Sequence, residues 1–296
     1  MRRAGCAPTL AALGIAVFLP VLAACSAAAQ SPAAGPEHAV VFAVEEAEGL
    51  ASHWITPVAT VEEGDYSPVP ASCEPQDAAA DAFFAHYLAA GRSYPLLSGG
   101  KQIGKIVSNG QRDPAGTPGS LADLRLLGGG QDPRAAMATD SASMARPQSR
   151  RRQPTPAERR QAAEVATQIL REHKVAEADL ARLRADGLAV ADLEGRGQFS
   201  LIATFVIPTP DDSGIQDSLF FVIKPGSEPT LLWYDHPNSV SQGEELLYVD
   251  QIPRRPGEPD DILVHVVSYR NSTYRIYRFH VIHWRPIFET PVYGCL

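Results

Sequence analysis

Residues 188–207 read LAVADLEGRGQFSLIATFVI, and this stretch decides the fold of the C-terminal half. Two apolar runs flank an acidic centre that contains Gly195 and Gly197, which is the pattern of two strands joined by a turn. A related stretch follows at 246–267, LLYVDQIPRRPGEPDDILVHVV, in which Asp250 stands 58 residues after Asp192. We therefore expect the chain after residue 155 to be built around two strand–turn–strand units.

The neighbours of these units also have the composition of strands. The expected strands cover 188–193, 200–207, 217–224, 229–234, 246–251, 262–269, 273–280 and 282–289. Short spacers rich in Gly, Pro, Asp and Asn separate them, which favours an antiparallel arrangement. Two helices are expected before the strands. Thr155-Pro156-Ala157-Glu158 has the form of a capping box with proline at the first helical position, and a second short helix should cover 178–185.

Residues 39–108 predict a small α+β module. Strands are expected at 39–44 and 54–61, a helix at 77–90, and a hairpin whose turn contains Gly99 and Gly100. Residues 109–154 contain many Pro and Gly residues and predict a flexible linker in which only 121–127 could be ordered. Its Arg150-Arg151-Arg152 run indicates a solvated segment, or else contact with an anionic surface. The expected fold class is thus α+β: the small α+β module, the disordered linker, and a mainly antiparallel β domain (155–296) preceded by two helices.

The sequence from Val190 to Ile202 resembles an FG-GAP or VCBS-type repeat, whose pattern is D-x-D-x-D-G-x-x-E-L-[IV]. The resemblance implies antiparallel blades and calcium in the acidic turn, because converging carboxylates suit a hard cation. Asp192 and Glu194 keep the first two acidic positions, whereas Arg196 and Ser200 replace the next two. We therefore expect a degenerate cation turn with no cofactor, in which these acids bind turn amides or pair with Arg196; calcium in this turn is the alternative.

The N-terminus predicts export. Arg2 and Arg3 precede an apolar run that ends in Leu22-Ala23-Ala24-Cys25, which resembles the lipobox of bacterial lipoproteins. The resemblance implies that 1–24 is a signal peptide, that Cys25 carries lipid, and that 25–38 is a tether. It places the protein in the bacterial cell envelope, lipid-anchored and facing the periplasm or the surface. The alternative is a soluble secreted protein cut after Ala27-Ala28-Ala29.

Charge and cysteine content narrow the function classes. A net charge of −8 argues against nucleic acid as a partner. Two of the four cysteines, Cys6 and Cys25, belong to the signal region. Cys73 and Cys295 form the remaining pair, and in an oxidising compartment we expect a disulfide between them, with two free thiols as the alternative. Neither cysteine has a second ligand at metal-site spacing, so no metal is expected.

Candidate catalytic, metal-binding and ligand-binding residues occur singly or in pairs, without a complete motif around them. His236 follows a strand without a nucleophile motif, and Asp260 and Asp261 are paired acids that we expect at a solvated strand start. His280 and His283 are three residues apart, a spacing that on a strand points two side chains to opposite faces, so we do not expect them to share one metal. Among the aromatic residues, Tyr274 and Trp284 are the candidates for an exposed binding face.

The favoured interpretation is a non-catalytic envelope lipoprotein with a β-rich binding or structural domain. Its partners would be the membrane, through the lipid, and a protein or glycan. One alternative is an envelope hydrolase that uses His236 or the Asp260/Asp261 pair. Another is an assembly factor whose linker reaches a partner.

Overall fold

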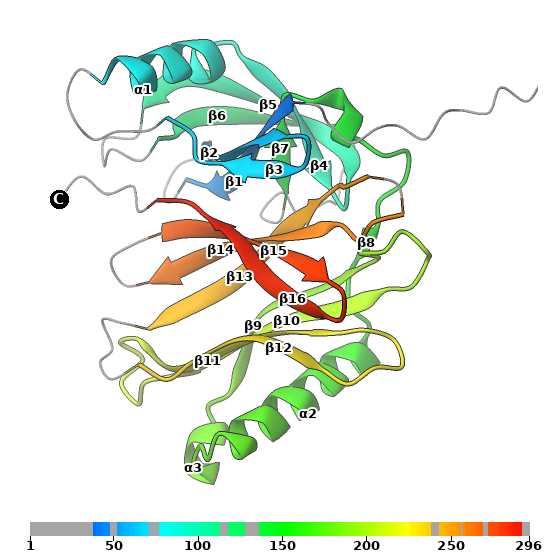
Figure 1. The fold of residues 1–296 in the computed structure, drawn as a ribbon. Coiled ribbons are helices and arrows are strands. Elements are labelled where there is room, and N and C mark those ends of the chain that lie inside the picture. Colours follow the sequence, from blue (N-terminus) through cyan, green and yellow to red (C-terminus); the bar gives the residue numbers. More distant parts are fainter. Residues whose placement is uncertain are drawn as a thin grey trace, which may run out of the picture. The chain divides into compact units, whose positions relative to one another are not determined.

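Antiparallel strands make up most of the chain, and helices are few (Figure 1). The computed structural model describes residues 38–47, 52–70, 77–112, 118–127, 136–237, 243–255, 257–268 and 272–291. All of these residues belong to one compact unit. The coarse fold class expected from the sequence is confirmed.

The N-terminal strands form a sheet that closes on itself, called the closed sheet below. Its strands are β1 (His38–Glu46), β2 (His53–Glu62), β3 (Asp65–Ser67), β4 (Ser93–Ser98), β5 (Lys101–Arg112), β6 (Ser120–Leu126) and β7 (Met137–Thr139). The pairing order is β1-β7-β4-β5-β6-β2-β3, and β1 also pairs with β2. The short helices α1 (Ala78–Phe83) and η1 (Phe84–Leu88) add Phe83 and Leu88 to its inner core. The first two strands, the helical segment and the Gly99–Gly100 hairpin agree with the sequence-based expectations.

The structure has ordered elements over 109–112 and 136–154, where the sequence predicts a flexible linker. Strand β6 confirms the ordered stretch near 121–127, and β7 pairs with both β1 and β4. The 3-10 helix η2 (Ala142–Met144) buries Met144 completely, and β8 (Arg151–Arg152) pairs with β9. These elements are short, so their order comes from tertiary contacts rather than from their own composition.

The two expected helices are present. Helix α2 (Pro156–Glu172) begins with the predicted capping box, in which the Thr155 hydroxyl accepts from Glu158 N–H and the Glu158 carboxylate accepts from Thr155 N–H. Its buried face consists of Ala162, Ala166 and Leu170. Helix α3 (Glu177–Leu180) is shorter than expected because strand β9 already begins at Arg184.

All eight expected strands of the C-terminal half are confirmed, with ends displaced by a few residues. They are β9 (Arg184–Ala191), β10 (Ser200–Pro208), β11 (Ile215–Ile223), β12 (Thr230–Asp235), β13 (Glu244–Ile252), β14 (Asp261–Ser268), β15 (Ser272–His280) and β16 (His283–Glu289). Strands β8 to β12 form a five-stranded sheet, and β13 to β16 form a four-stranded sheet. Each of the two related sequence stretches supplies the first two strands of a four-stranded antiparallel meander, β9–β12 or β13–β16.

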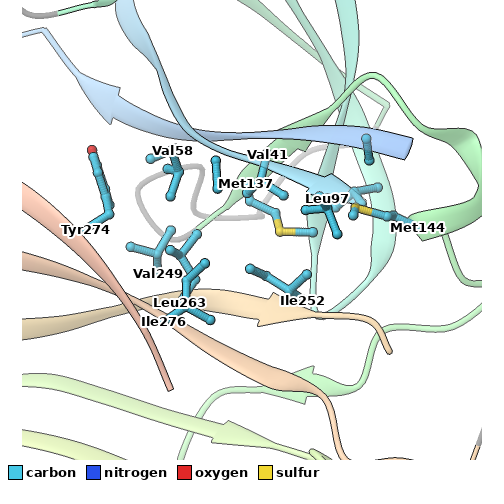
Figure 2. Packing of buried hydrophobic residues seen from close by; sticks show 14 residues of the cluster. Val41, Val58, Leu97, Met137, Met144, Val249, Ile252, Leu263, Tyr274 and Ile276 are labelled. Carbon is cyan, nitrogen blue, oxygen red and sulfur yellow. The ribbon is translucent and has the colours of Figure 1, made fainter. Parts of the chain in front are cut away.

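Three hydrophobic cores hold these layers together. The closed sheet packs its outer face on the four-stranded sheet through a core that includes Val41, Met137 and Leu263 (Figure 2). The other face of the four-stranded sheet packs on the five-stranded sheet around Phe220 and Tyr277. Helix α2 covers the far side of the five-stranded sheet. The layer order within the unit is therefore closed sheet, four-stranded sheet, five-stranded sheet and helix.

Candidate functional site

Three of the sequence-predicted residues lie outside the described part of the chain. They are the lipidation residue Cys25 and the disulfide pair Cys73 and Cys295. The lipid anchor and the disulfide therefore stay predictions.

The acidic turn between β9 and β10 is held by its own polar groups. Asp192 is almost fully buried, and its two carboxylate oxygens accept from Arg196 N–H at 3.1 Å and Gly197 N–H at 2.8 Å. Glu194 pairs with Lys224 at 2.9 Å and with Arg196 at 3.5 Å. Asp192 therefore binds turn amides, and Glu194 pairs with Lys224 as well as with Arg196.

The Asp260–Asp261 pair is buried, which corrects the expectation of a solvated strand start. Both residues have no exposed surface. Asp260 accepts two N–H groups of Arg146, at 2.5 and 2.6 Å, and one from Gln251 at 2.8 Å. Asp261 binds elsewhere, to the Arg278 guanidinium at 2.8 Å and to Tyr66 Oη at 2.8 Å. The two carboxylates therefore belong to two separate ion pairs and do not converge on a common substrate position.

The arginine run 150–152 is also engaged inside the fold. Arg150 lies 3.6 Å from Asp260, Arg151 donates to Val249 O at 2.9 Å, and Arg152 pairs with Glu158 at 2.7 Å. The expectation of a solvated segment is wrong for Arg150 and Arg151, which bind inside the fold, whereas Arg152 is exposed and pairs with Glu158 of α2. Arg146, Arg150 and Arg151 thus connect the segment after the closed sheet to the four-stranded sheet and the loop before β14.

Asp250 lies where the hairpin between β4 and β5 meets the four-stranded sheet. The tight turn between β4 and β5 reaches it, and its fully buried carboxylate accepts Gly99 N–H at 2.9 Å. Burial raises the pKa of Asp250 to about 7, and the nearby Arg151 guanidinium opposes that rise. Asp250 aligns with Asp192 in the sequence, yet it joins two layers instead of closing its own turn.

His236 has the geometry of an acid–base group. Its Nδ1 lies 2.8 Å from Oδ1 of Asp217, which is fully buried and also accepts from Tyr234 Oη at 2.8 Å. The second Asp217 oxygen has no hydrogen-bond partner among the described residues. His173, at the end of α2, stacks on Tyr234 with 3.9 Å between ring centroids. A buried carboxylate that orients an exposed imidazole could serve proton transfer.

Glu245 is a buried acid that the sequence does not indicate. Glu245 on β13 is almost fully buried and shares a hydrogen bond with Asp186 at the start of β9. Burial, and then the Asp186 carboxylate, raise the pKa of Glu245 to about 9. The raised pKa favours the protonated, neutral form of the Glu245 carboxyl at neutral pH. Residues 186 and 245 are far apart in the sequence, so no local motif could reveal the pair.

The expected aromatic binding face is not exposed. Tyr274 is 3% exposed, donates to Glu45 and stacks on His265, while Trp284 is 7% exposed in the core between the two C-terminal sheets. Their strand positions face cores rather than solvent. Large exposed apolar side chains occur instead next to Trp284, at Val281 and Ile282.

His280 and His283 are cross-strand partners at the turn between β15 and β16. Their ring centroids are 6.4 Å apart. The expectation of opposite faces is wrong because the chain reverses between the two residues. Among the described residues no group of three or more His, Cys, Asp or Glu side chains is placed to hold a metal.

Comparisons with known proteins give no assignment. No protein-family model matches the chain, and neither a curated protein nor a solved structure matches it at a significant level. Over the described residues, no helix has the length and apolar character needed to cross a bilayer. Any function must therefore be argued from this chain's own residues.

Proposed function

We propose that this chain is an exported, lipid-anchored protein of the bacterial cell envelope whose folded body is a non-catalytic binding or structural module. The export and anchor part rests on Arg2, Arg3 and the Leu22-Ala23-Ala24-Cys25 sequence. The partners would be the membrane, through lipid on Cys25, and a protein or glycan of the envelope.

One observation carries the non-catalytic part: Asp260 and Asp261 each bind a separate arginine inside the fold. A catalytic acid pair needs carboxyl groups that reach a shared substrate. These two carboxylates are fully buried and have partners from elements distant in the sequence. Their charge is used to join strands and layers, which is a structural role.

Labelling with palmitate tests the anchor. Cells that express the protein should incorporate the label into it, and the protein should sediment with membranes. Cys25→Ala should abolish the label, whereas the matched control Cys6→Ala, in the same signal region, should retain it. A soluble, unlabelled wild-type protein, or a labelled Cys25→Ala variant, would contradict the anchor.

An envelope hydrolase is the second candidate, because the His236 imidazole is oriented by the buried Asp217. Purified protein can be tested on ester, peptide and glycan substrates. The non-catalytic proposal predicts no turnover that depends on His236. Hydrolysis that falls about 100-fold or more in His236→Ala, but not in the control His86→Ala, with unchanged melting temperature, would favour the hydrolase.

A further inference from the structure

The turn between β15 and β16 exposes two adjacent apolar side chains. Val281 is 77% exposed and Ile282 is 80% exposed, more than any other large apolar residue in the described part of the chain. They are the two residues between the cross-strand partners His280 and His283, so they form the tip of a tight hairpin. An isolated exposed apolar residue is common, but two neighbours at a projecting tip form a small continuous patch.

The backbone of this tip is strained. Val281 has φ of 58°, and His280 O accepts Ile282 N–H at 2.7 Å. A β-branched residue in the left-handed region is an outlier, and glycine would adopt this turn without cost. The chain thus keeps a large apolar side chain where backbone conformation disfavours it. Strain of this kind is found where a side chain has a role outside the fold.

Basic side chains lie on the two strands next to the tip. His280, His283 and Arg285 are exposed, and none of the three makes an ion pair with another described residue. Lys224 lies nearby, over the Phe279 ring, but it is paired with Glu194. An apolar tip flanked by exposed basic side chains matches the acyl chains and headgroups of an anionic bilayer.

We propose that the tip formed by Val281 and Ile282 inserts into the surface of an anionic lipid bilayer, with His280, His283 and Arg285 at headgroup level. This inference rests on the proposed lipid anchor, which would hold the body near a membrane. Twelve residues separate Cys25 from His38, where β1 begins. Fully extended, they reach about 40 Å at most. The body can therefore lie against the membrane that holds the lipid.

A bilayer fits this tip better than a protein does. A stable protein interface covers about 800 Å² on each partner, and two side chains on a convex turn supply only a small part of that. A bilayer accepts single apolar side chains from a projecting tip without a complementary surface. Insertion of one Ile side chain contributes about 1.5–3 kcal/mol, which is enough to add a weak second contact to a lipid anchor.

Vesicle flotation tests the inference. The chain from Ser26 onward contains every described element and has no lipidation residue, so binding would come from the body itself. It should float with vesicles of equal parts phosphatidylglycerol and phosphatidylcholine, and less with phosphatidylcholine alone. Added salt should weaken binding to the anionic vesicles. Ile282→Ser should lower the apparent affinity about tenfold or more. Leu127→Ser, which changes an exposed apolar side chain elsewhere on the surface, should leave the apparent affinity within about twofold.

Val281→Gly separates loss of insertion from loss of folding. It relieves the strained backbone, so the melting temperature should rise by about 2–4 °C while vesicle binding falls. No flotation of the wild-type chain, or equal flotation of Ile282→Ser, would overturn the proposal. The proposal would also be overturned if the wild-type chain does not bind vesicles but forms a dimer without lipid, and Ile282→Ser dissociates that dimer. If the full-length protein carries lipid but the chain from Ser26 onward does not float, membrane insertion of the tip is refuted and the lipid anchor stands. If the chain from Ser26 onward floats but the full-length protein carries no lipid on Cys25, only the lipid anchor is refuted.

Discussion

Asp260 is fully buried, and its carboxylate receives N–H groups from Arg146 and Gln251. A buried ion pair contributes little relative to apolar residues, but removal of one partner leaves an uncompensated charge. The structural role of this carboxylate therefore predicts that its replacement by an uncharged amide strongly lowers the stability of the fold.

Asp260→Asn should lower the free energy of unfolding by about 3–5 kcal/mol, because Arg146 would stay buried without its counter-charge. Urea denaturation at pH 7 measures this loss. The matched control is Glu177→Gln in the exposed pair with Arg171, which should cost at most about 1 kcal/mol. Equal, small effects of the two changes would show that Asp260 does not stabilise the fold.

Asp250 predicts a pH dependence of stability. Burial raises the pKa of Asp250 from its ordinary value of 3.8 to about 7, so the folded state binds the proton more tightly than the unfolded state does. Its contribution to stability is full below about pH 4 and is lost as the pH rises to about 7.

The test compares unfolding of wild type and Asp250→Asn between pH 4 and 8. The amide oxygen can still accept Gly99 N–H, and it does not ionise. The variant should lose less stability than wild type as the pH rises through this range. Identical pH profiles would contradict the raised pKa.

Among the elements, the hairpin between β4 and β5 makes the closest backbone approach to the segment after the closed sheet. Gly99 has φ of 57°, and an added Cβ would lie 2.6 Å from Arg151 N. Gly99 O also accepts Arg150 N–H at 2.8 Å. Both the conformation and the space at this position require glycine.

Gly99→Ala should therefore destabilise the protein more than an ordinary glycine substitution at positive φ. Gly226 is the matched control, since its φ is 70° and an added Cβ meets no atom within 4 Å. Gly226→Ala should cost about 1 kcal/mol from backbone strain alone, and Gly99→Ala should cost at least about 2 kcal/mol. The difference in melting temperature checks this order, and equal costs would argue against the close approach.

The sequence predicts strands well where local periodicity is strong. All eight strands after residue 184 were indicated, as was the capping box at Thr155, because alternation and turn residues are local signals. Strands β7 and β8 were missed because each is held by neighbours distant in the chain. The ion pairs of the candidate sites were missed for the same reason, since 114 residues separate Arg146 from Asp260.

The error at His280 and His283 has a different cause. The sequence predicts the strands on either side, but a spacing of three residues indicates opposite faces only where the chain runs on as one strand. A two-residue reversal between them makes them neighbours on one face. The expected exposure of Tyr274 and Trp284 failed because strand alternation gives two faces without telling which face is covered by another layer.

For the whole molecule, the layers share their cores. The core between the closed sheet and the four-stranded sheet contains residues from both, including Val58 and Ile276 (Figure 2). Asp250 and Asp261 add polar contacts across the same boundary, to Gly99 and Tyr66. Layers joined by apolar burial and buried ion pairs should unfold together.

The most direct test of a structural role for the buried carboxylates is equilibrium unfolding followed by two local probes. Trp54 lies on β2 of the closed sheet, and Trp284 lies on β16 of the four-stranded sheet. Variants that keep one of these tryptophans, with the other two changed to Phe, report each layer separately. If the layers form one body, the two urea midpoints coincide, and both fall by the same amount in Asp260→Asn. A closed sheet that unfolds at a clearly different urea concentration, or a pair of midpoints unmoved by Asp260→Asn, would contradict the account.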